Sequence, residues 1–451
     1  MKVFTSIVLN YSLNFVLLLI FLTTWAVQSQ EKIRSSFNEN FSSSFVLELE
    51  SAYEFDAQQL QKTELVLKPE FIYRFGKKVR FTVKGRVYGE LNDHLEPGTS
   101  DENTVSNASQ RVFIGDRTEL ELREAYFDFF LGKKGNLRIG KQQIVWGETD
   151  GLKLLDVLNP QNFREFVLDK FEDSRLPLWS VKYEFPLTKL IDVQLVWIPD
   201  LSYNIIPTIE APYFPRSIVP KIPEGIPVQF NSIEKPDHVL KDSDIGLKLS
   251  AFIKGWDLSV NYLYHYDDLP LFYRTNTLEG IEITQKFNRQ HLLGGTFNNT
   301  FGNFIFRGEL AYTINKGFHT EDPLDSNGVE KTSQFIGALG LDWISGESFL
   351  SFQVFNDWLV KEIQPFNRER YELNFSFLAS PEFMNDALKA ELLTVLNANR
   401  GDWMLRPKVS YFLTSNLEVN IGGDFFGGDR NGLFGQFEDR NRIYLGLTLG
   451  L

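Results

Sequence analysis

Apolar residues recur at every second position through most of the chain after residue 41. The segment 256–266 is the clearest case, because one residue, usually polar, separates each apolar residue from the next. A period of two is that of a β-strand, whereas a helix repeats every 3.6 residues. The chain is therefore expected to be all-β. The alternating apolar set in this segment is Trp256, Leu258, Val260, Tyr262, Tyr264 and Tyr266.

Soluble β-sandwiches also alternate in this way, so the length of the segments and the spacing of the links must separate the two classes. Most segments run about ten residues, which fits a tilted membrane-spanning strand better than the shorter strands of soluble sheets. Tight turns, as at 76–77 and 254–255, alternate with longer links, as at 91–117, 147–177 and 199–242. This rhythm predicts a single transmembrane antiparallel β-barrel with short periplasmic turns and long extracellular loops.

The number of links predicts about eighteen strands, within a range of sixteen to eighteen, over residues 45–451. An even number places both ends of the barrel on the periplasmic side. Residues 281–297 are interpreted as one strand, although a turn at Asn288-Arg289 would split it and give nineteen. The last segment, 443–451, resembles the closing strand that outer-membrane assembly machinery reads, except that it ends on Leu451 and not on an aromatic residue.

The N-terminus has the layout of a secretory signal peptide. Lys2 precedes an apolar run from Phe15 to Leu22, and the small residues Ala26 and Ser29 follow. Residues 1–29 are therefore predicted to be removed, and residues 30–44 to form a periplasmic segment before the barrel. A retained membrane anchor is the alternative. Together with the strand pattern, this predicts a protein of the outer membrane of a Gram-negative bacterium, with outer-membrane lipids around it.

Charge and composition exclude several classes of protein. Without residues 1–29 the net charge is near −14, which argues against nucleic acid as a partner. The chain has no cysteine, so disulfides and attachment as a lipoprotein are both excluded. A mean hydropathy of −0.20 argues against a bundle of membrane helices.

Alternation also assigns charged residues to the inside of the barrel, because they lie between residues that would face lipid. Both signs of charge are present, which predicts a water-filled lumen without predicting its ion selectivity. The alternative is that these charges pair across strands and only solvate the wall. The residues predicted to line the pore are Arg80, Lys84, Arg86, Glu121, Arg123, Arg138, Gln142, Arg307, Glu309 and Arg406.

The link 147–177 is predicted to fold into the lumen and narrow it. It is longer than closure of two strands requires, and its many apolar residues would be costly to leave in water. An external cap packed on the segment Pro207–Pro236, within the proline-rich extracellular loop 199–242, is the alternative. The residues predicted to line a constriction are Lys153, Asp156, Arg164 and Glu165.

No pattern of residues predicts catalysis, a cofactor or a metal site. The five histidines are far apart, and none has a second histidine at metal-ligand spacing. Asp325-x-Asn327-Gly328 matches part of a calcium loop, but Pro323 stands where the first ligand should be, so a turn is expected.

Several short motifs, in order, resemble those of a family of uncharacterised bacterial outer-membrane barrels and, more distantly, those of the alginate-export porins. The resemblance implies a barrel of eighteen or a similar number of strands that passes solutes, sometimes beside an inner-membrane efflux transporter. The motifs are Leu122-Arg123-Glu124-Ala125-Tyr126, Arg138-x-Gly140-Lys141-Gln142 with Trp146-Gly147, Asp156 to Pro160, Arg175-Leu176-Pro177, Arg307 to Tyr312, and Arg406-Pro407 with Ser410-Tyr411.

The sequence thus favours an outer-membrane channel, porin-like, that passes a small solute of unknown identity or serves as an export conduit. A barrel that is plugged by its loops and acts as a surface-binding or structural protein is the alternative from another class. A hydrolase embedded in the barrel is a third and weaker interpretation, because no serine motif accompanies the one histidine and aspartate that share a strand face, His265 and Asp267.

Overall fold

The computed structural model describes residues 39–97, 111–149, 151–216, 225–320, 327–365 and 368–451. The predicted signal peptide 1–29 and most of the predicted periplasmic segment 30–44 lie outside these residues. In the part of the chain that the structure describes, no helix is long and apolar enough to cross a membrane.

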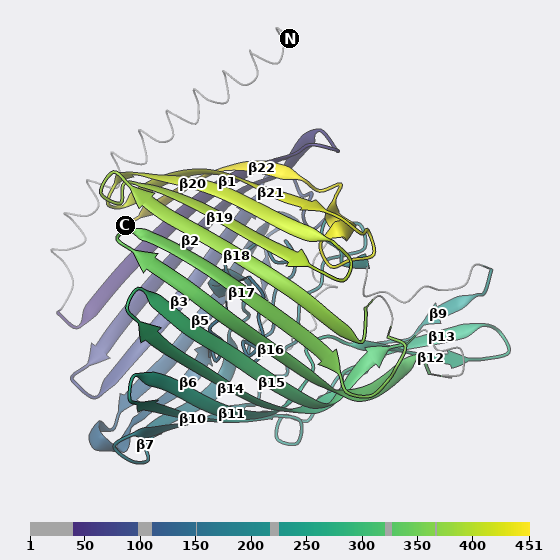
Figure 1. The fold of residues 1–451 in the computed structure, drawn as a ribbon, viewed down its shortest axis with the longest axis horizontal. Helices are drawn as coiled ribbons and strands as arrows, with labels where there is room; N and C mark the ends of the chain where they lie inside the picture. Colours follow the sequence, from purple (N-terminus) through teal and green to yellow (C-terminus); the bar gives the residue numbers. More distant parts are fainter. Residues whose placement is uncertain (1–38, 98–110, 150, 217–224, 321–326, 366–367) are drawn as a thin grey trace, which may run out of the picture.

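Eighteen antiparallel strands form one closed barrel, which confirms the predicted fold (Figure 1). Each strand pairs with its neighbour along the chain, and the last strand pairs with the first, from Val46 opposite Gly450 to Glu54 opposite Arg442. The ring contains β1 (Phe41–Glu54), β2 (Gln59–Phe75), β3 (Val79–Glu90), β5 (Thr118–Phe130), β6 (Asn136–Gln142), β7 (Leu178–Pro186), β8 (Ile191–Ile198), β10 (Asp244–Ile253), β11 (Trp256–Tyr266), β14 (Arg289–Phe301), β15 (Phe304–His319), β16 (Val329–Ser345), β17 (Ser348–Leu359), β18 (Tyr371–Phe383), β19 (Leu388–Asn397), β20 (Trp403–Thr414), β21 (Leu417–Gly427) and β22 (Arg442–Gly450).

The barrel begins four residues earlier than predicted, at Phe41 and not at residue 45. The extra residues are held by β2, where Phe41 lies opposite Tyr73 and Ser43 opposite Phe71. Among the described residues, the short strand β4 (Val112–Phe113) pairs with β5 alone. Short helical turns occur at η2 (Gly132–Lys134), α2 (Phe171–Ser174) and η4 (Gly435–Phe437).

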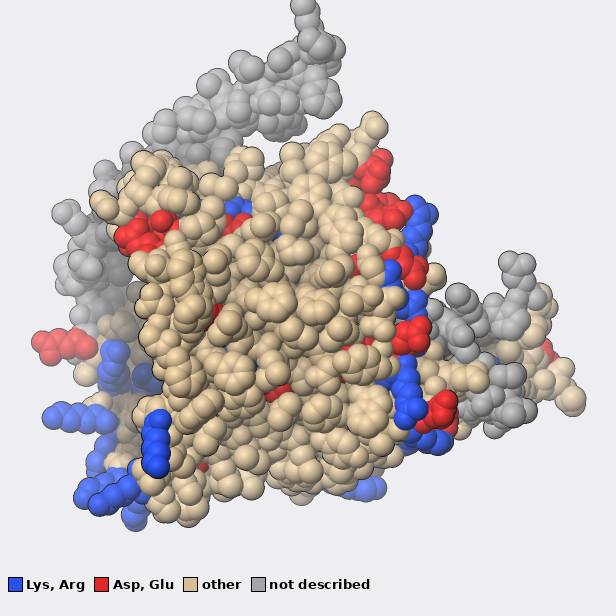
Figure 2. Space-filling view, in the orientation of Figure 1, with Lys and Arg blue, Asp and Glu red and all other residues tan. Residues whose placement is uncertain are grey.

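Side chains alternate between the lipid side and the lumen as the sequence indicates. On β11, Val260 is 63% exposed, whereas its neighbours Ser259 and Asn261 are buried toward the interior. On β22, Ile443 and Leu445 are exposed on the outer face, and Leu447 follows on the same face by the alternation of the strand but is itself buried. Figure 2 shows the result as a broad band of uncharged residues, with charged side chains gathered toward the two rims.

One strand assignment was wrong. Residues 281–297 are not a single strand, because β13 (Ile281–Lys286) leaves the barrel and pairs with β12 (Leu271–Asn276) and with β9 (Val228–Phe230). The chain turns at Phe287, whose ring stacks on Tyr203 with 3.7 Å between centroids, and the barrel resumes with β14. The small sheet projects beyond the wall in Figure 1, so the barrel still has eighteen strands.

The lipid-facing assignment carries a first prediction. Replacing Val260, at the middle of β11, by arginine should destabilise the barrel by about 2–4 kcal/mol, because a charged side chain would face the hydrocarbon core. Ile253→Arg is the matched control: Ile253, opposite Trp256, is also exposed on the outer face but lies at the end of β10, where the cost should be about 0–1 kcal/mol. Urea unfolding in lipid vesicles measures both, and equal costs would contradict the assignment.

Candidate pore and its constriction

The segment from Gln143 to Pro177, called here the inner loop, leaves β6 and returns at β7. Its first anchor is apolar: Trp146 and Leu155 are buried against inward-facing residues of β7, β8, β11, β14 and β15. Glycines in the wall make the space. A Cβ at Gly246 would lie 2.8 Å from the Trp146 ring, and a Cβ at Gly294 would lie 2.4 Å from Leu155. The wall is therefore hollowed where the loop packs on it.

Asn159, from the Asn-Pro motif, ties the two ends of the inner loop together. Its side-chain oxygen accepts a hydrogen bond from the Ile144 amide at 2.8 Å, and its side-chain nitrogen donates to the Leu176 carbonyl at 2.8 Å. The Asp156 carboxylate accepts a hydrogen bond at 2.7 Å from Arg175, near the other end of the inner loop. The polar residues of this motif therefore fix the shape of the loop.

Arg307 and Glu309 of β15 hold the start of the inner loop. The Glu309 carboxylate accepts from the amides of Glu148 and Leu155, the latter at 3.3 Å. Arg307 donates to the Glu148 carbonyl and pairs with Asp342 of β16 at 2.9 Å. Both residues were predicted to line the pore. Both face the lumen, and both form hydrogen bonds with the inner loop.

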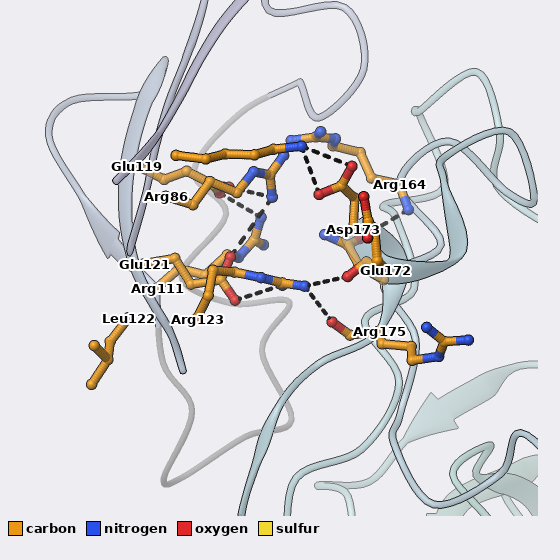
Figure 3. A network of polar contacts seen from close by, with 12 residues as sticks. Arg86, Arg111, Glu119, Glu121, Leu122, Arg123, Arg164, Glu172, Asp173 and Arg175 are labelled. Carbon is orange, nitrogen blue, oxygen red and sulfur yellow. Dashed lines mark hydrogen bonds and ion pairs between the residues drawn. The ribbon is translucent and has the colours of Figure 1, made fainter. Parts of the chain in front are cut away.

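A network of arginines and glutamates connects the end of the inner loop to β3 and β5 (Figure 3). Arg123 pairs with Glu121 at 3.0 Å and donates to the carbonyls of Glu172 and Arg175 at 2.9 and 2.7 Å. Arg123 is the extra residue of a β-bulge, because Lys84 lies opposite Glu124 while Gly85 lies opposite Leu122. A bulge re-aims a side chain, and here it brings the guanidinium to the loop.

The same network buries charges that the sequence assigned to the pore wall. Arg86 lies 3.4 Å from Glu119 and 3.7 Å from Glu121, and only 8% of Arg86 is exposed. Arg164 of the inner loop stacks over the Tyr88 ring at 4.1 Å and is 1% exposed. These side chains therefore fix the loop against the wall instead of facing an open channel.

Glu165 of the inner loop contacts the wall where the last strand, β22, pairs with the first strand, β1, next to β2. It lies 2.8 Å from Lys62 and 2.8 Å from Arg442, and all three side chains are buried. Burial alone would raise the pKa of Glu165, but the charges of Lys62 and Arg442 outweigh it and hold the pKa well below the usual range. The carboxylate is therefore ionised at neutral pH.

The tip of the inner loop packs on β19, β20 and β21. Arg406 donates to the carbonyls of Leu168 and Val167 at 2.7 and 3.4 Å, and also to Asp424 at 2.8 Å. Phe166 and Leu168 belong to an apolar cluster with residues of these strands and of three other links. Its buried members are Leu95, Phe166, Leu168, Tyr213, Val395, Met404, Phe426, Phe434 and Phe437. Contacts to opposite walls place the inner loop across the interior of the barrel.

The other residues that were predicted to line the pore or the constriction lie away from the contacts between the inner loop and the wall, or within the inner loop itself. Arg80 and Arg138 share the buried Asp128, at 2.6 and 2.7 Å. Lys84 pairs with Glu124 at 2.9 Å, and Gln142 donates to the Ser180 carbonyl at 3.2 Å.

Lys153 lies 3.8 Å from Asp156 and over the Phe171 ring at 4.4 Å. Burial lowers the pKa of Lys153 to about 8, although the Asp156 charge opposes the shift. Lys153 and Asp156, two of the four residues predicted to line the constriction, therefore contact other residues of the inner loop.

Lys141 belongs to a motif quoted from the sequence, but no role was predicted for it. Its ammonium donates to the Leu122 carbonyl at 2.7 Å, beside the bulge at Arg123, and the side chain is 2% exposed. The preceding Gly140 has a φ of +137°, and a Cβ there would lie 2.2 Å from the Ala125 carbonyl. The Gly-Lys pair of the motif thus lets β6 approach the bulged strand closely and supplies a donor there.

The proline-rich loop 199–242 is not wholly external. Its first part lies on the inner loop, because Gln161 donates to Asn204 at 2.6 Å and Phe163 donates to the Ile205 carbonyl at 2.9 Å. Tyr213 is completely buried and donates to Gln61 of β2 at 3.1 Å. The inner loop therefore contacts both the wall and this second loop, so elements of both predicted arrangements occur.

Two adjoining cavities lie between the inner loop and the wall. The first, of about 160 Å³, lies along β1, β2 and β20 to β22, and the second, of about 270 Å³, lies along β18 to β20. Both are lined by the same five residues at their junction, and we call the two together the side passage. The shared residues are Asp169, Lys170, Arg406, Lys408 and Tyr444.

One group of side chains among the described residues has the spacing of metal ligands. Asp237, His238 and Asp242 offer atoms within 4.8 Å of one another, just before β10. Two of them are exposed, and exposed acidic groups of this kind are common without an ion. The group lies outside the side passage, and no function is assigned to it.

Comparisons with known proteins agree on the fold. The structure is similar to Pseudomonas aeruginosa OccK1 (OpdK), with a TM-score of 0.54 and 11% identity over 92% of this chain and 100% of that one. It is also similar to Pseudomonas aeruginosa OccK3 (OpdO), with a TM-score of 0.52 and 10% identity over 92% and 96%. It is similar as well to Acinetobacter baumannii OccAB2, with a TM-score of 0.51 and 12% identity over 92% of this chain and 99% of that one.

A search of curated proteins found no match. The family model described as "Protein of unknown function (DUF1302)" matches residues 53–369, which is more than two thirds of the chain and includes the strands and the inner loop that carry the quoted motifs up to Tyr312. The chain therefore belongs to the DUF1302 family, here with the fold of an eighteen-stranded barrel.

Proposed function

We propose that the protein is a porin-like channel of the outer membrane of a Gram-negative bacterium, and that small water-soluble solutes cross it through the side passage. The observation that carries the proposal is the pair of adjoining cavities left between the inner loop and the wall formed by β18 to β22 with β1 and β2. An eighteen-stranded ring is wide enough for an aqueous channel, and the inner loop would set its narrowest part.

The fold similarity to OccK1 and OccK3 supports this proposal, as does the polar lining of the first cavity. Transport by an export route beside an inner-membrane transporter stays a prediction from the family resemblance. The plugged, surface-binding barrel is the competing function, because the inner loop contacts so much of the wall.

Single-channel recording in a planar lipid bilayer tests the proposal. A channel should give steady unitary currents from the purified, folded barrel. A barrel that migrates as folded, inserts into the bilayer and carries no current would support the plugged alternative.

The pH dependence of the current carries a second prediction. Asp169 lies at the junction of the two cavities, where burial and then the negative charge of Glu165 raise the pKa of Asp169 to about 6. Asp169 should be mostly ionised at pH 7 and mostly neutral at pH 5. Loss of this charge should lower the number of mobile cations in the side passage and reduce the conductance. Asp169→Asn should abolish this fall in conductance between pH 7 and pH 5. A fall of unchanged size in the variant would show that another group causes it.

A further inference from the structure

The side passage has an excess of negative charge. Nine acidic residues but only five basic residues line its two cavities. Lys68, which does not line the cavities, pairs with Glu48 at 2.6 Å and with Asp173 at 2.8 Å, so it offsets one further charge. The excess remains after this correction.

The buried basic residues of the side passage are each held by several carboxylates. Lys62 lies 2.7 Å from Glu50, 3.2 Å from Glu64 and 2.8 Å from Glu165, and 3% of its side chain is exposed. Arg442 lies between Asp424 and Glu165, at 2.7 and 2.8 Å. Because their charge is already neutralised by these partners, neither group is free to attract an anion that passes.

Acidic residues also outnumber basic residues among the more exposed charges of the side passage. Lys408 lies between two glutamates, 4.0 Å from Glu391 on β19 and 3.8 Å from Glu418 on β21. The side chains of Glu391 and Lys408 are exposed to similar extents, at 33% and 28%, so both face the water of the passage. Two carboxylates beside one ammonium leave one negative charge uncompensated. Lys170, the most exposed cation of the lining, is itself paired with Glu48 at 3.1 Å.

The small volumes of the two cavities, about 160 and 270 Å³, keep an ion close to these charges. Charges closer together than the Debye length, about 8 Å at physiological salt, are not screened from an ion that moves between them. A cleft whose lining carries a net charge of one sign between low-dielectric walls concentrates ions of the opposite sign. The apolar residues Leu378, Leu393 and Met404 on one side of the second cavity supply such a wall.

From this charge arrangement we infer that the side passage selects cations over anions, and that Glu391 and Glu418 are its accessible selectivity residues. The inference rests on the proposed channel function and names the charge class of its solutes. Inorganic K⁺ and Cl⁻ are sufficient probes of it.

The reversal potential under a KCl gradient measures the inference directly. The wild-type channel should pass K⁺ in preference to Cl⁻, by on the order of tenfold at low salt. The double variant Glu391→Gln with Glu418→Gln should move the permeability ratio most of the way toward one. Glutamine keeps the shape of the side chain and an acceptor for the Ser410 hydroxyl, which donates to Glu418 at 2.7 Å.

Glu184→Gln is the matched control. Glu184 also faces the lumen and pairs with a lysine, Lys182 at 3.0 Å, but it lies on β7, on the wall opposite β19. Its replacement should leave the ratio unchanged. An open wild-type channel that prefers Cl⁻, or a K⁺ preference that survives the double variant, would overturn the inference while the channel function stands. A folded, inserted barrel without any current would instead overturn the proposed function.

Discussion

Deletion of residues 154–169 should raise the single-channel conductance several-fold. These residues carry the part of the inner loop that reaches from the β15 wall to β19–β22, including Leu155, Glu165 and Phe166. The barrel should still close, because its strands pair with each other and not with the loop. Without the loop the lumen would approach the open width of an eighteen-stranded ring.

Removal of residues 276–281, at the tip of the projecting β12–β13 hairpin, is the control for this deletion. The hairpin lies outside the ring of strands in Figure 1, so the conductance should not change. A folded deletion variant of the inner loop with wild-type conductance would show that this loop does not set the narrowest part of the channel.

Replacement of Glu165 by leucine should destabilise the folded barrel by about 3–5 kcal/mol. The change removes the carboxylate shared by Lys62 and Arg442, and a buried charge without its partner is costly in a protein interior. Lys62 keeps Glu50 and Glu64, and Arg442 keeps Asp424, so the lower end of this range is expected. Urea unfolding in lipid vesicles measures the effect.

Two further variants separate the lost charge from the lost packing. Glu165→Gln keeps the shape and should still cost a large part of the effect, since it removes only the charge. Glu282→Leu, on the projecting sheet, should cost less than about 1 kcal/mol, because its interactions are partly exposed to water. Equal stability of Glu165→Leu and the wild type would mean that this ion cluster does not hold the inner loop.

The barrel could be predicted from the sequence because lipid on one side and water on the other impose the same period on every strand. Apart from the start of the first strand, the assignment failed at residues 281–297, where the apolar pattern continues through Phe287 although the chain leaves the projecting sheet and enters the barrel there. Local periodicity does not show which sheet a strand joins, since that depends on the contact of Phe287 with the distant Tyr203.

The inner loop could be anticipated from its apolar content, but the roles of the charged residues could not. Alternation places Arg86, Arg123, Arg307 and Glu309 on the lumen side. It does not show that Arg123, Arg307 and Glu309 form hydrogen bonds with the inner loop. Lys62 and Arg442 are 103 and 277 positions from Glu165, so no local pattern joins the three. No role was predicted for Lys141 because the bulge at Arg123 and the positive φ of Gly140 interrupt the alternation beside it.

Block of the current by a thiol reagent at a single introduced cysteine tests whether solutes cross through the side passage, because the natural chain has no cysteine. Thr448 of β22 lines the side passage, whereas Ser259 of β11 faces inward on the opposite wall. We expect a charged methanethiosulfonate to reduce the single-channel current of Thr448→Cys in one step and to leave that of Ser259→Cys unchanged. Block at Ser259→Cys with no effect at Thr448→Cys would contradict it, since solutes would then cross on the other side of the inner loop.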